Sequence, residues 1–260
     1  MIKIIVCGAL GRMGSRILEL ANGDVNFSII GALEAEKNPS IGKKVLDGKI
    51  VIQNDLNLFK DKADVIIDFT SPEATLSHLE TIQNWKGITA VIGTTGFSSQ
   101  QKETIQNLSK KMALLLSPNM SVGVNLLLNL VRTAAKTIPQ YDIEIIESHH
   151  NQKKDAPSGT AIALASEITD ELKRNPNQDW TYGRQGNVGA RKNKEIGIHA
   201  VRGGDIVGDH TVLFAGLGER IELTHRASSR DAFAIGALRA AQWLSNKKSG
   251  FYSMKDVLGN

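Results

Sequence analysis

The sequence is poor in residue types that mark several protein classes. Cys7 is the only cysteine among 260 residues, and aromatic residues make up 5%. A single cysteine cannot form an internal disulfide, which excludes a small secreted domain stapled by such bonds. Cys7 ends an apolar run, so we interpret it as a small buried hydrophobe rather than a reactive thiol. These features favour a protein of the reducing cytoplasm.

Long hydrophobic runs are also missing. No apolar stretch approaches the ~20 residues of a membrane span, and the amino terminus reads as a strand rather than a signal peptide. Hydrophobic residues at 41% and charged residues at 22% are typical of globular proteins. We expect no membrane partner, and a chain of this length forms either one large domain or two modest ones.

A strong excess of charge is lacking as well. The net charge is +4, from 31 basic and 27 acidic residues. The two basic clusters, 191–194 and 247–248, are not interleaved with aromatic residues as a nucleic-acid surface would be. We expect no nucleic-acid partner, and an anionic substrate and cofactor explain the small surplus.

The amino-terminal segment has the order strand, glycine turn, helix. The β-branched run 2–7 leads directly into the turn, and apolar residues at helical spacing follow. This order is the first unit of a dinucleotide-binding fold, in which the glycines admit a pyrophosphate and a closely packed helix. The predicted cofactor-binding residues of the turn are Gly8, Ala9, Leu10, Gly11, Arg12, Met13 and Gly14.

Glu34 supports this interpretation. It ends the second predicted strand about 20 positions after Gly14, where such folds place the carboxylate that binds the ribose. The glycine spacing, Gly-x-x-Gly-x-x-Gly, is not the common one and is a weak signal by itself. An α/β unit whose glycines serve packing alone remains the structural alternative.

Strands and helices alternate as far as about residue 117, which predicts a parallel sheet covered on both faces. Ligands of such sheets lie beyond the carboxyl ends of the strands. Short polar segments follow three of these ends, and they either line the cofactor or simply cap helices. They are Asp68-Phe69-Thr70, then Gly93, Thr94 and Thr95, then Ser117, Pro118, Asn119 and Met120.

The pattern changes in the second half of the chain. A long amphipathic helix over 124–138 precedes further strands, a polar loop over 175–194 and a helix over 232–244 that Ser228 and Ser229 should cap. We predict an α/β protein: a Rossmann-type parallel-sheet domain plus a second α+β domain with a mixed or antiparallel sheet. The expected domains are 1–119 with 229–260 for the dinucleotide, and 120–228 for substrate binding and oligomerisation.

The segment Glu147–Ala161 concentrates chemistry. It holds His149, His150 and Lys153 at a strand end, next to a helix start whose N–H groups suit an anion. Imidazoles and ammoniums beside an anion site indicate proton transfer to a small, negatively charged molecule. Ordinary surface histidines and a well-capped helix are the alternative reading.

Several motifs together resemble the dihydrodipicolinate reductase (4-hydroxy-tetrahydrodipicolinate reductase) family over essentially the whole length. They are Gly8-x-x-Gly-Arg-Met-Gly14, Asp68-Phe69-Thr70, Gly93-Thr-Thr-Gly-Phe97, Asn119-Met-Ser-Val-Gly-Val-Asn125, Glu147-x-His-His-x-x-Lys153, Asp155-Ala-Pro-Ser-Gly-Thr160 and Arg202-Gly-Gly-Asp-Ile-Val-Gly208. The resemblance implies reduction of a cyclic dicarboxylate imine by NADH or NADPH, in lysine and diaminopimelate synthesis, by a cytoplasmic homotetramer.

The resemblance also implies roles for individual residues. His149 acts as general acid, Lys153 assists as proton donor and charge partner, and His150 with the backbone of Gly159 and Thr160 holds a carboxylate. An imidazole with a pKa near ~6.5 can donate a proton at neutral pH. The partner of the second carboxylate is left open among Lys154, Arg202 and Arg230.

Glu34 is followed by Ala35, whereas family members that use a phosphorylated cofactor often carry an arginine there. The carboxylate should repel a 2′-phosphate, so NADH is preferred or both cofactors are used, with Lys37 and Arg12 as possible phosphate partners. No metal is expected, since adjacent histidines of an extended strand point to opposite sides. A non-catalytic dinucleotide sensor and another two-domain NAD(P)-dependent reductase are the alternative functions.

Overall fold

The computed structural model describes residues 1–259, which form two compact units. The first unit comprises Met1–Val122 and the C-terminal segment from Arg230, and the second comprises Gly123–Ser229. Within residues 1–259, no helix combines the length and apolar character needed to span a membrane.

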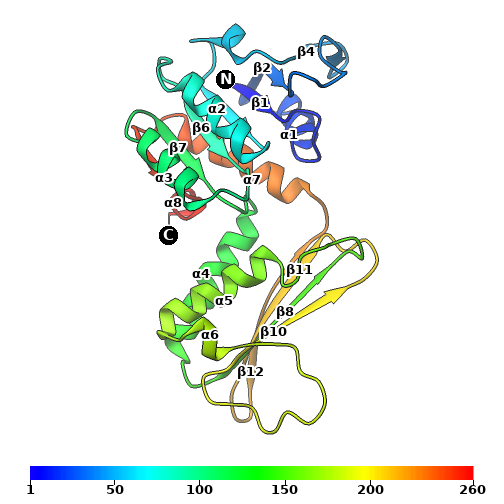
Figure 1. Cartoon of the computed structure of the whole chain (residues 1–260), viewed down its shortest axis with the longest axis vertical. Coiled ribbons are helices and arrows are strands. Elements are labelled where there is room, and N and C mark those ends of the chain that lie inside the picture. Colours follow the sequence, from blue (N-terminus) through cyan, green and yellow to red (C-terminus); the bar gives the residue numbers. More distant parts are fainter. Residues whose placement is uncertain (260) are drawn as a thin grey trace. The chain divides into compact units, whose positions relative to one another are not determined.

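An eight-stranded sheet forms the centre of the first unit (Figure 1). Its order is β13-β7-β6-β5-β1-β2-β4-β3, and every neighbouring pair is parallel except β3 and β4. The strands are β1 (Ile2–Cys7), β2 (Phe27–Leu33), β3 (Lys44–Val45), β4 (Ile50–Gln53), β5 (Val65–Asp68), β6 (Thr89–Ile92), β7 (Ala113–Leu116) and β13 (Gly250–Tyr252). The predicted Rossmann-type parallel sheet is thus confirmed.

Helices cover both faces of this sheet because its strands alternate between two apolar cores. Ile4 and Val6 of β1 face α1, α7 and α8, whereas Ile5 and Cys7 face α2 and α3. The helices are α1 (Gly14–Asn22), α2 (Pro72–Ile82), α3 (Ser99–Leu108), α7 (Asp231–Leu244), α8 (Met254–Leu258) and the 3₁₀ turn η1 (Leu56–Phe59). The sheet is therefore buried on both sides, as the apolar strands require.

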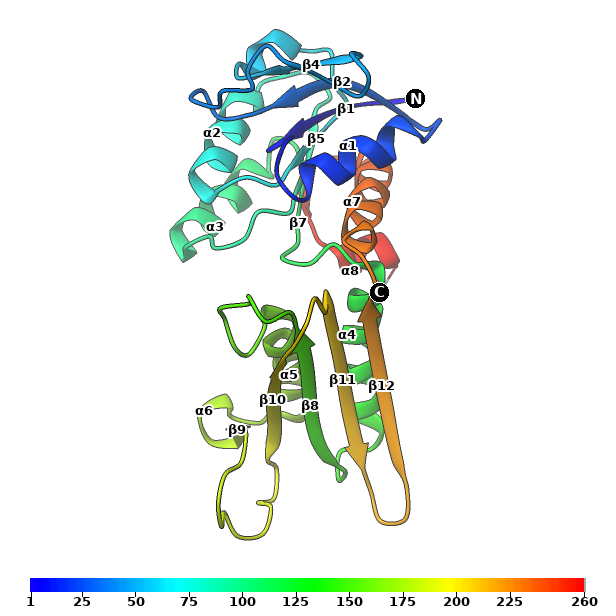
Figure 2. The same ribbon diagram turned by 90° about the vertical axis from the view of Figure 1, so that its right-hand side faces the viewer.

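The second unit is a five-stranded mixed sheet with helices on one face (Figure 2). Its order is β12-β11-β8-β10-β9; β8, β10 and β9 are parallel, and β11 is antiparallel to both of its neighbours. The elements are α4 (Val122–Thr137), β8 (Asp142–His149), α5 (Gly159–Leu172), α6 (Pro176–Asp179), β9 (Trp180–Tyr182), β10 (Ile196–Arg202), β11 (Gly208–Ala215) and β12 (Arg220–Ala227). Apolar residues of α4 and α5 pack on alternate residues of β8, β10 and β11.

Two local expectations were wrong, and two short elements were not anticipated. The polar loop over 175–194 contains α6 and β9, where the Trp180 indole donates a hydrogen bond to Thr169 of α5 at 2.8 Å. Ser228 and Ser229 do not cap α7, whose N-cap is Arg230 without a side-chain cap. Strand β13 and helix α8 were not anticipated, because elements of three and five residues are too short to show a period.

Candidate active site

The glycine turn between β1 and α1 is packed so tightly that no side chain fits at its first and last glycines. Gly8 has φ +74°, and a Cβ there would lie 2.5 Å from the carbonyl oxygen of Phe69. A Cβ on Gly14 would lie 2.0 Å from the carbonyl oxygen of Gly8. The first helical turn therefore presents its backbone N–H groups at close range, which fits a pyrophosphate.

The Glu34 carboxylate lies at this turn. It directly follows β2, and its Oε1 accepts a hydrogen bond from the N–H of Leu10 at 2.7 Å. Its Oε2 accepts from the Asn38 amide at 3.0 Å. A carboxylate held beside the glycine turn is correctly placed to accept hydrogen bonds from ribose hydroxyls. The turn and Glu34 together therefore fit a dinucleotide.

A pocket of about 210 Å³ lies over the turn and brings together segments that are distant in the sequence. Its lining consists of Gly11, Arg12, Met13, Phe69, Thr70, Gly93, Thr94 and Thr95. Thr94 and Thr95 also line a second pocket of about 570 Å³, to which Pro118 contributes. The predicted cofactor segments thus converge at the carboxyl ends of the strands.

Other residues of these segments point elsewhere. The side chains of Ala9 and Met120 are buried in the core, so only their backbone atoms are available to a ligand. The buried Ser117 hydroxyl donates to the Asn119 carbonyl at 2.7 Å, which fixes the loop after β7. Leu10, at 40% exposure, is the most exposed apolar side chain of the glycine turn.

Asp68 organises the loops beneath the pocket, a role that the sequence did not reveal. This carboxylate is buried at the end of β5 and accepts hydrogen bonds from the hydroxyls of Thr70, Thr75 and Thr94, at 2.6 to 3.1 Å. His78 Nδ1 lies 2.7 Å from its other oxygen. The carboxylate therefore ties the loop after β5 to the loop after β6.

His149 is held by a carboxylate in the second unit. It ends β8 and is 9% exposed, and its Nδ1 lies 2.5 Å from Oε2 of Glu147. Residues two positions apart on a strand share a face, which explains why these side chains meet. The imidazole is thus fixed through one nitrogen, which leaves Nε2 for other chemistry.

Glu147 is itself fully buried and bound by several donors. Arg202 donates to both carboxylate oxygens, at 2.8 and 2.9 Å, and the Ser158 N–H donates at 3.0 Å. Burial by itself raises the pKa of Glu147, but the hydrogen bonds from Arg202, His149 and Ser158 outweigh it and hold the pKa below its ordinary value. Glu147 is therefore ionised at neutral pH.

The contacts of Arg202 bear on which residue could bind the second carboxylate of the substrate. Both outer nitrogens of the Arg202 guanidinium are bound within the protein, to Glu147 and to the carbonyl oxygens of Asp155 and Val201. Arg202 is thus committed to positioning Glu147 and the loop at Asp155. Lys154 and Arg230 remain as the candidates that the sequence suggested.

Lys153 and the start of α5 flank His149 along the chain. The Lys153 ammonium lies 2.8 Å from Oδ1 of Asp155, and this hydrogen bond lowers the pKa of Asp155. Gly159 and Thr160 are the first residues of α5, whose N-cap Ser158 accepts a hydrogen bond from the Ala161 N–H. The side chain of His150 is half-buried, and the backbone N–H of this residue donates to the Ile206 carbonyl at 2.8 Å. A second histidine, a lysine and a helix N-terminus therefore follow His149 within a short stretch of the chain.

His210 is a second buried imidazole that the sequence did not single out. It belongs to β11, and its ring packs edge-on against that of His149 with the centroids 5.2 Å apart. Its Nε2 lies 3.0 Å from the Ser158 hydroxyl. Burial, reinforced by the positive charge of His149, lowers the pKa of His210 to about 4. His210 is therefore neutral at neutral pH.

We predict that His210 makes the protein less stable as the pH falls. Its folded-state pKa of about 4 lies below the ordinary value of 6.5, so the unfolded chain binds the proton first. The stability present above pH 6.5 is lost progressively between pH 6.5 and 4, by about 2 kcal/mol at pH 5. Urea unfolding of the native protein and of His210→Gln at pH 7 and 5 measures this loss, which the variant should lack. An equal pH dependence in the two proteins would contradict the assignment.

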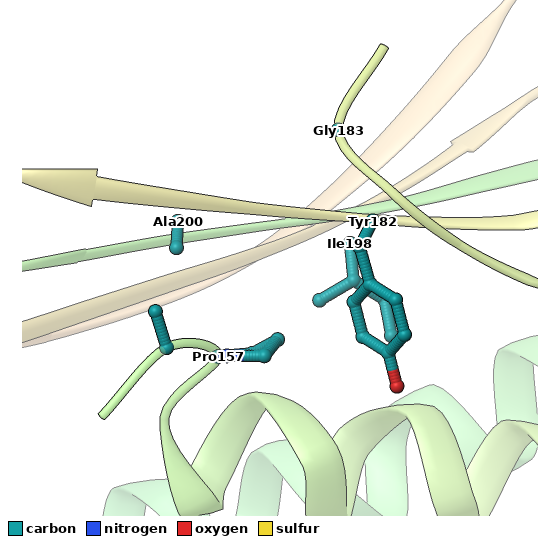
Figure 3. A pocket seen from close by; sticks show the side chains of 6 residues that line it. Pro157, Tyr182, Gly183, Ile198 and Ala200 are labelled. Atoms are coloured by element: carbon teal, nitrogen blue, oxygen red, sulfur yellow. The ribbon is translucent and has the colours of Figure 1, made fainter.

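The pocket of about 480 Å³ shown in Figure 3 lies in the second unit, next to the loop that joins Asp155 to Ser158. Its lining is apolar apart from the Tyr182 hydroxyl and offers no cation. It comprises Ala156, Pro157, Tyr182, Gly183, Ile198 and Ala200. This pocket does not match a dicarboxylate, and we do not include it in the site.

The sequence features that could have identified the remaining site residues differ in strength. The spacing Glu147-x-His149 could have suggested the pair, because strand residues two apart lie on one face. The sequence suggested Arg202 only as a partner of the substrate and did not suggest His210, because both reach Glu147 and His149 through the pairing of β10 and β11 with β8. Asp68 was noted only as one member of a loop.

With this geometry described, the chain was compared with known proteins. The family model for the N-terminus of dihydrodipicolinate reductase matches residues 2–120, and the model for its C-terminus matches residues 123–258. The chain belongs to the dihydrodipicolinate reductase family. The resemblance predicted from the motifs is confirmed, and with it an oxidoreductase that uses a nicotinamide cofactor.

Individual relatives are similar in sequence over nearly their whole length. The 4-hydroxy-tetrahydrodipicolinate reductase of Nitrosomonas europaea is 47% identical, with 99% of this chain and 98% of the relative covered. That of Aquifex aeolicus is 48% identical, with 99% of each covered. A solved structure of dipicolinate-bound dihydrodipicolinate reductase from Paenisporosarcina sp. TG-14 matches with a TM-score of 0.79, 25% identity and 97% of each chain covered.

Proposed function

We propose that this protein reduces 4-hydroxy-tetrahydrodipicolinate, after loss of water to dihydrodipicolinate, to tetrahydrodipicolinate in lysine and diaminopimelate biosynthesis. The relatives carry the name of this activity, and the solved relative binds dipicolinate, a related ring dicarboxylate. The observation that carries the proposal is His149, buried on Glu147, a carboxylate that also binds the N–H of Ser158 at the start of α5. A proton donor among anion-binding groups suits the addition of hydride to an anionic imine.

The two units divide this task. The first unit, predicted as 1–119 with 229–260, binds the dinucleotide through its glycine turn and the loops after β5, β6 and β7. The second, predicted as 120–228, binds the substrate and carries the proton donor. When bound, the reduced nicotinamide supplies the hydride, and all other steps belong to side chains of this chain.

His149 is the general acid in this proposal. Hydride addition to a conjugated imine builds up negative charge on the ring system, which a proton must neutralise. The Nε2–H of a protonated His149 delivers that proton, while its Nδ1–H stays on Glu147.

Lys153 and the N-terminus of α5 hold the substrate. Lys153 contributes its positive charge and assists as a proton donor. The N–H groups of Gly159 and Thr160, with His150, bind a carboxylate at the positive end of α5. The substrate is thereby oriented through its carboxylates, next to His149.

NADH is the preferred cofactor in our proposal, with use of NADPH also allowed. Glu34 holds a negative charge beside the turn, where it accepts ribose hydroxyls and repels a 2′-phosphate. Arg12 and Lys37 are exposed and offset only part of this repulsion.

Replacement of Glu34 tests this preference. Glu34→Gln keeps the side-chain size and removes the charge, so we expect about a 10-fold loss in kcat/KM with NADH and a gain with NADPH. Initial rates with each cofactor measure both changes, and Glu36→Gln, an exposed acid two residues on, is the control. Native kcat/KM with NADPH equal to or above that with NADH would remove the proposed preference.

A homotetramer is the proposed assembly, with the open face of the second sheet as the contact surface. The face opposite α4 and α5 exposes Ile146 at 40% and Val201 at 47%, flanked by Thr211 and Leu213. Exposed apolar residues on a flat sheet are typical of an interface between subunits. Light scattering in solution measures the number of subunits.

We place the protein in the cytoplasm. Cys7 is its only cysteine and is fully buried, and burial, with the charges of Asp68 and Glu34, raises the pKa of its thiol. The chain thus carries no disulfide that would need an oxidising compartment. We expect neither a nucleic-acid nor a membrane partner.

Oxidation of NADH and of NADPH by the purified protein tests the activity. The unstable substrate is generated in place from pyruvate and aspartate semialdehyde by the preceding synthase. Turnover that depends on this synthase supports the proposal. Binding of either cofactor without turnover would favour a dinucleotide sensor instead, and turnover of other imines or keto acids would favour a different reductase.

A further inference from the structure

We infer that Glu147 is a positioning residue that fixes the tautomer and orientation of His149. This inference rests on the proposed role of His149 as proton donor and adds a specific requirement to it. The transferable proton must be on Nε2, and the buried carboxylate enforces this by holding the other proton on Nδ1.

The first support is that the Glu147 carboxylate cannot rotate away. It is 0% exposed, and both oxygens accept hydrogen bonds, Oε1 from Arg202 and the Ser158 N–H, and Oε2 from Arg202 and His149. These donors come from β10, from the N-cap of α5 and from β8 itself. Loss of any contact would leave a buried charge less well satisfied, so the group is held in one position.

The second support is the position of the proton on the His149 ring. An ionised carboxylate only accepts hydrogen bonds, so the nitrogen that faces it must carry a proton. The lowered pKa of Glu147 keeps it ionised. Neutral His149 is therefore the Nδ1–H tautomer, and its Nε2 gains and loses the catalytic proton.

The third support is the space left at Nε2. Gly208 begins β11 opposite this nitrogen, and a Cβ there would lie 3.0 Å from Nε2 of His149. Any larger side chain would thus press on the nitrogen that is proposed to exchange the proton. Glu147 thus holds the Nδ1 side of the ring, and Gly208 leaves room at the Nε2 side.

The charges around His149 agree with this arrangement. Glu147 of β8 and His210 of β11 contact the His149 ring. The other titratable and charged groups of the surrounding elements are Arg202 on β10, which contacts Glu147, His225 on β12, which acts on His210, and His150, Lys153 and Asp155 in the loop after β8. Glu147 is the anion that contacts the ring, and His210, with its pKa near 4, adds no positive charge at neutral pH. Glu147 is thus the group that can stabilise a protonated His149.

The decisive variant is Glu147→Gln. Its amide places either a donor or a weaker acceptor against Nδ1, so the ring loses the enforced tautomer. We expect kcat to fall by up to about 10,000-fold, by analogy with the loss of the orienting carboxylate in a catalytic triad, with KM changed less than about threefold. Glu147→Asp, which keeps the carboxylate, should recover part of kcat.

The tautomer can be observed directly in the native protein. With ¹⁵N-labelled histidine, the six imidazoles are resolved by NMR, and the His149 signals are those missing from His149→Gln. We expect the neutral imidazole of His149 to be the Nδ1–H form in the native protein, and this form to be lost or mixed with the other tautomer in Glu147→Gln. Finding the Nε2–H form in the native protein would overturn the inference even if the variant did not fold.

Glu144→Gln is the matched control. Glu144 lies on the same strand, on the other face, and also accepts hydrogen bonds from an arginine and a histidine, Arg184 and His199. Its loss should lower stability while kcat and the His149 signals stay native. If Glu144→Gln reduced kcat as much as Glu147→Gln, the effect would be structural and the inference would fail.

The outcomes also separate this inference from the proposed function. Collapse of His149→Gln with normal turnover of Glu147→Gln would remove the role of Glu147 and leave that of His149. Normal turnover of His149→Gln would remove the proposed proton donor itself. Native cofactor binding by each variant, measured by fluorescence titration, confirms that the first unit is intact.

Discussion

His149→Gln should lower kcat by about 100- to 10,000-fold, the range that a positioned general acid contributes. The amide can keep a hydrogen bond to Glu147, but it has no proton to give at neutral pH. KM for the cofactor should stay within about threefold, because the residue belongs to the second unit. Steady-state rates with the coupled assay, together with thermal melting, measure the effect.

A second histidine in the same sheet provides the control for that result. His199 also lies within hydrogen-bond distance of a glutamate, Glu144, at 2.6 Å, but on the opposite face of the sheet. His199→Gln should keep kcat within about twofold. Equal losses in the two variants would indicate damage to the sheet, and native kcat in His149→Gln would rule out the proposed acid.

Gly14→Ala should abolish cofactor binding and destabilise the first unit. The added Cβ would lie 2.0 Å from the carbonyl oxygen of Gly8 and 2.8 Å from the Cα of Ala9, so backbone atoms must move. Overpacking of this kind costs about 1–3 kcal/mol. Because the displaced atoms form the phosphate turn, we expect NADH affinity to fall more than about 100-fold.

Gly23→Ala tests whether the effect belongs to the turn. Gly23 follows the same helix with φ −91°, and a Cβ there would meet its nearest neighbour, the Leu20 carbonyl oxygen, at 3.7 Å. We expect native NADH binding and little change in unfolding free energy. Calorimetric titration and urea unfolding of both variants measure the contrast, and tight NADH binding by Gly14→Ala would disprove the role of the turn.

Local pattern sufficed for the parts of the fold whose signals lie close together in the chain. The strand 2–7, the glycine turn and the helix after it are one continuous segment, and the position of Glu34 follows from the length of the next strand. Strand β13 and helix α8 escaped because three and five residues cannot show a period. Ser228 and Ser229 gave a false cap signal, since such residues are common in loops as well as at helix starts.

The candidate site shows the same division. His149, Lys153, Gly159 and Thr160 lie within twelve consecutive residues, so the sequence alone placed a proton donor, a cation and a helix start together. The motifs of that segment also determined the family. The sequence could not place Arg202 on Glu147 or His210 against His149, because these partners are brought in by strand pairing.

The sequence by itself thus determined which chemical groups are available, the alternation of strands and helices that indicates a parallel sheet, and the turn that admits a dinucleotide, because each depends on neighbours along the chain. Only the tertiary structure decided which groups are buried, ionised and fixed. Burial and the four hydrogen bonds to the Glu147 carboxylate depend on residues up to 55 positions away, and so does the orientation of His149. Those contacts exist only once β8, β10, β11 and α5 have assembled.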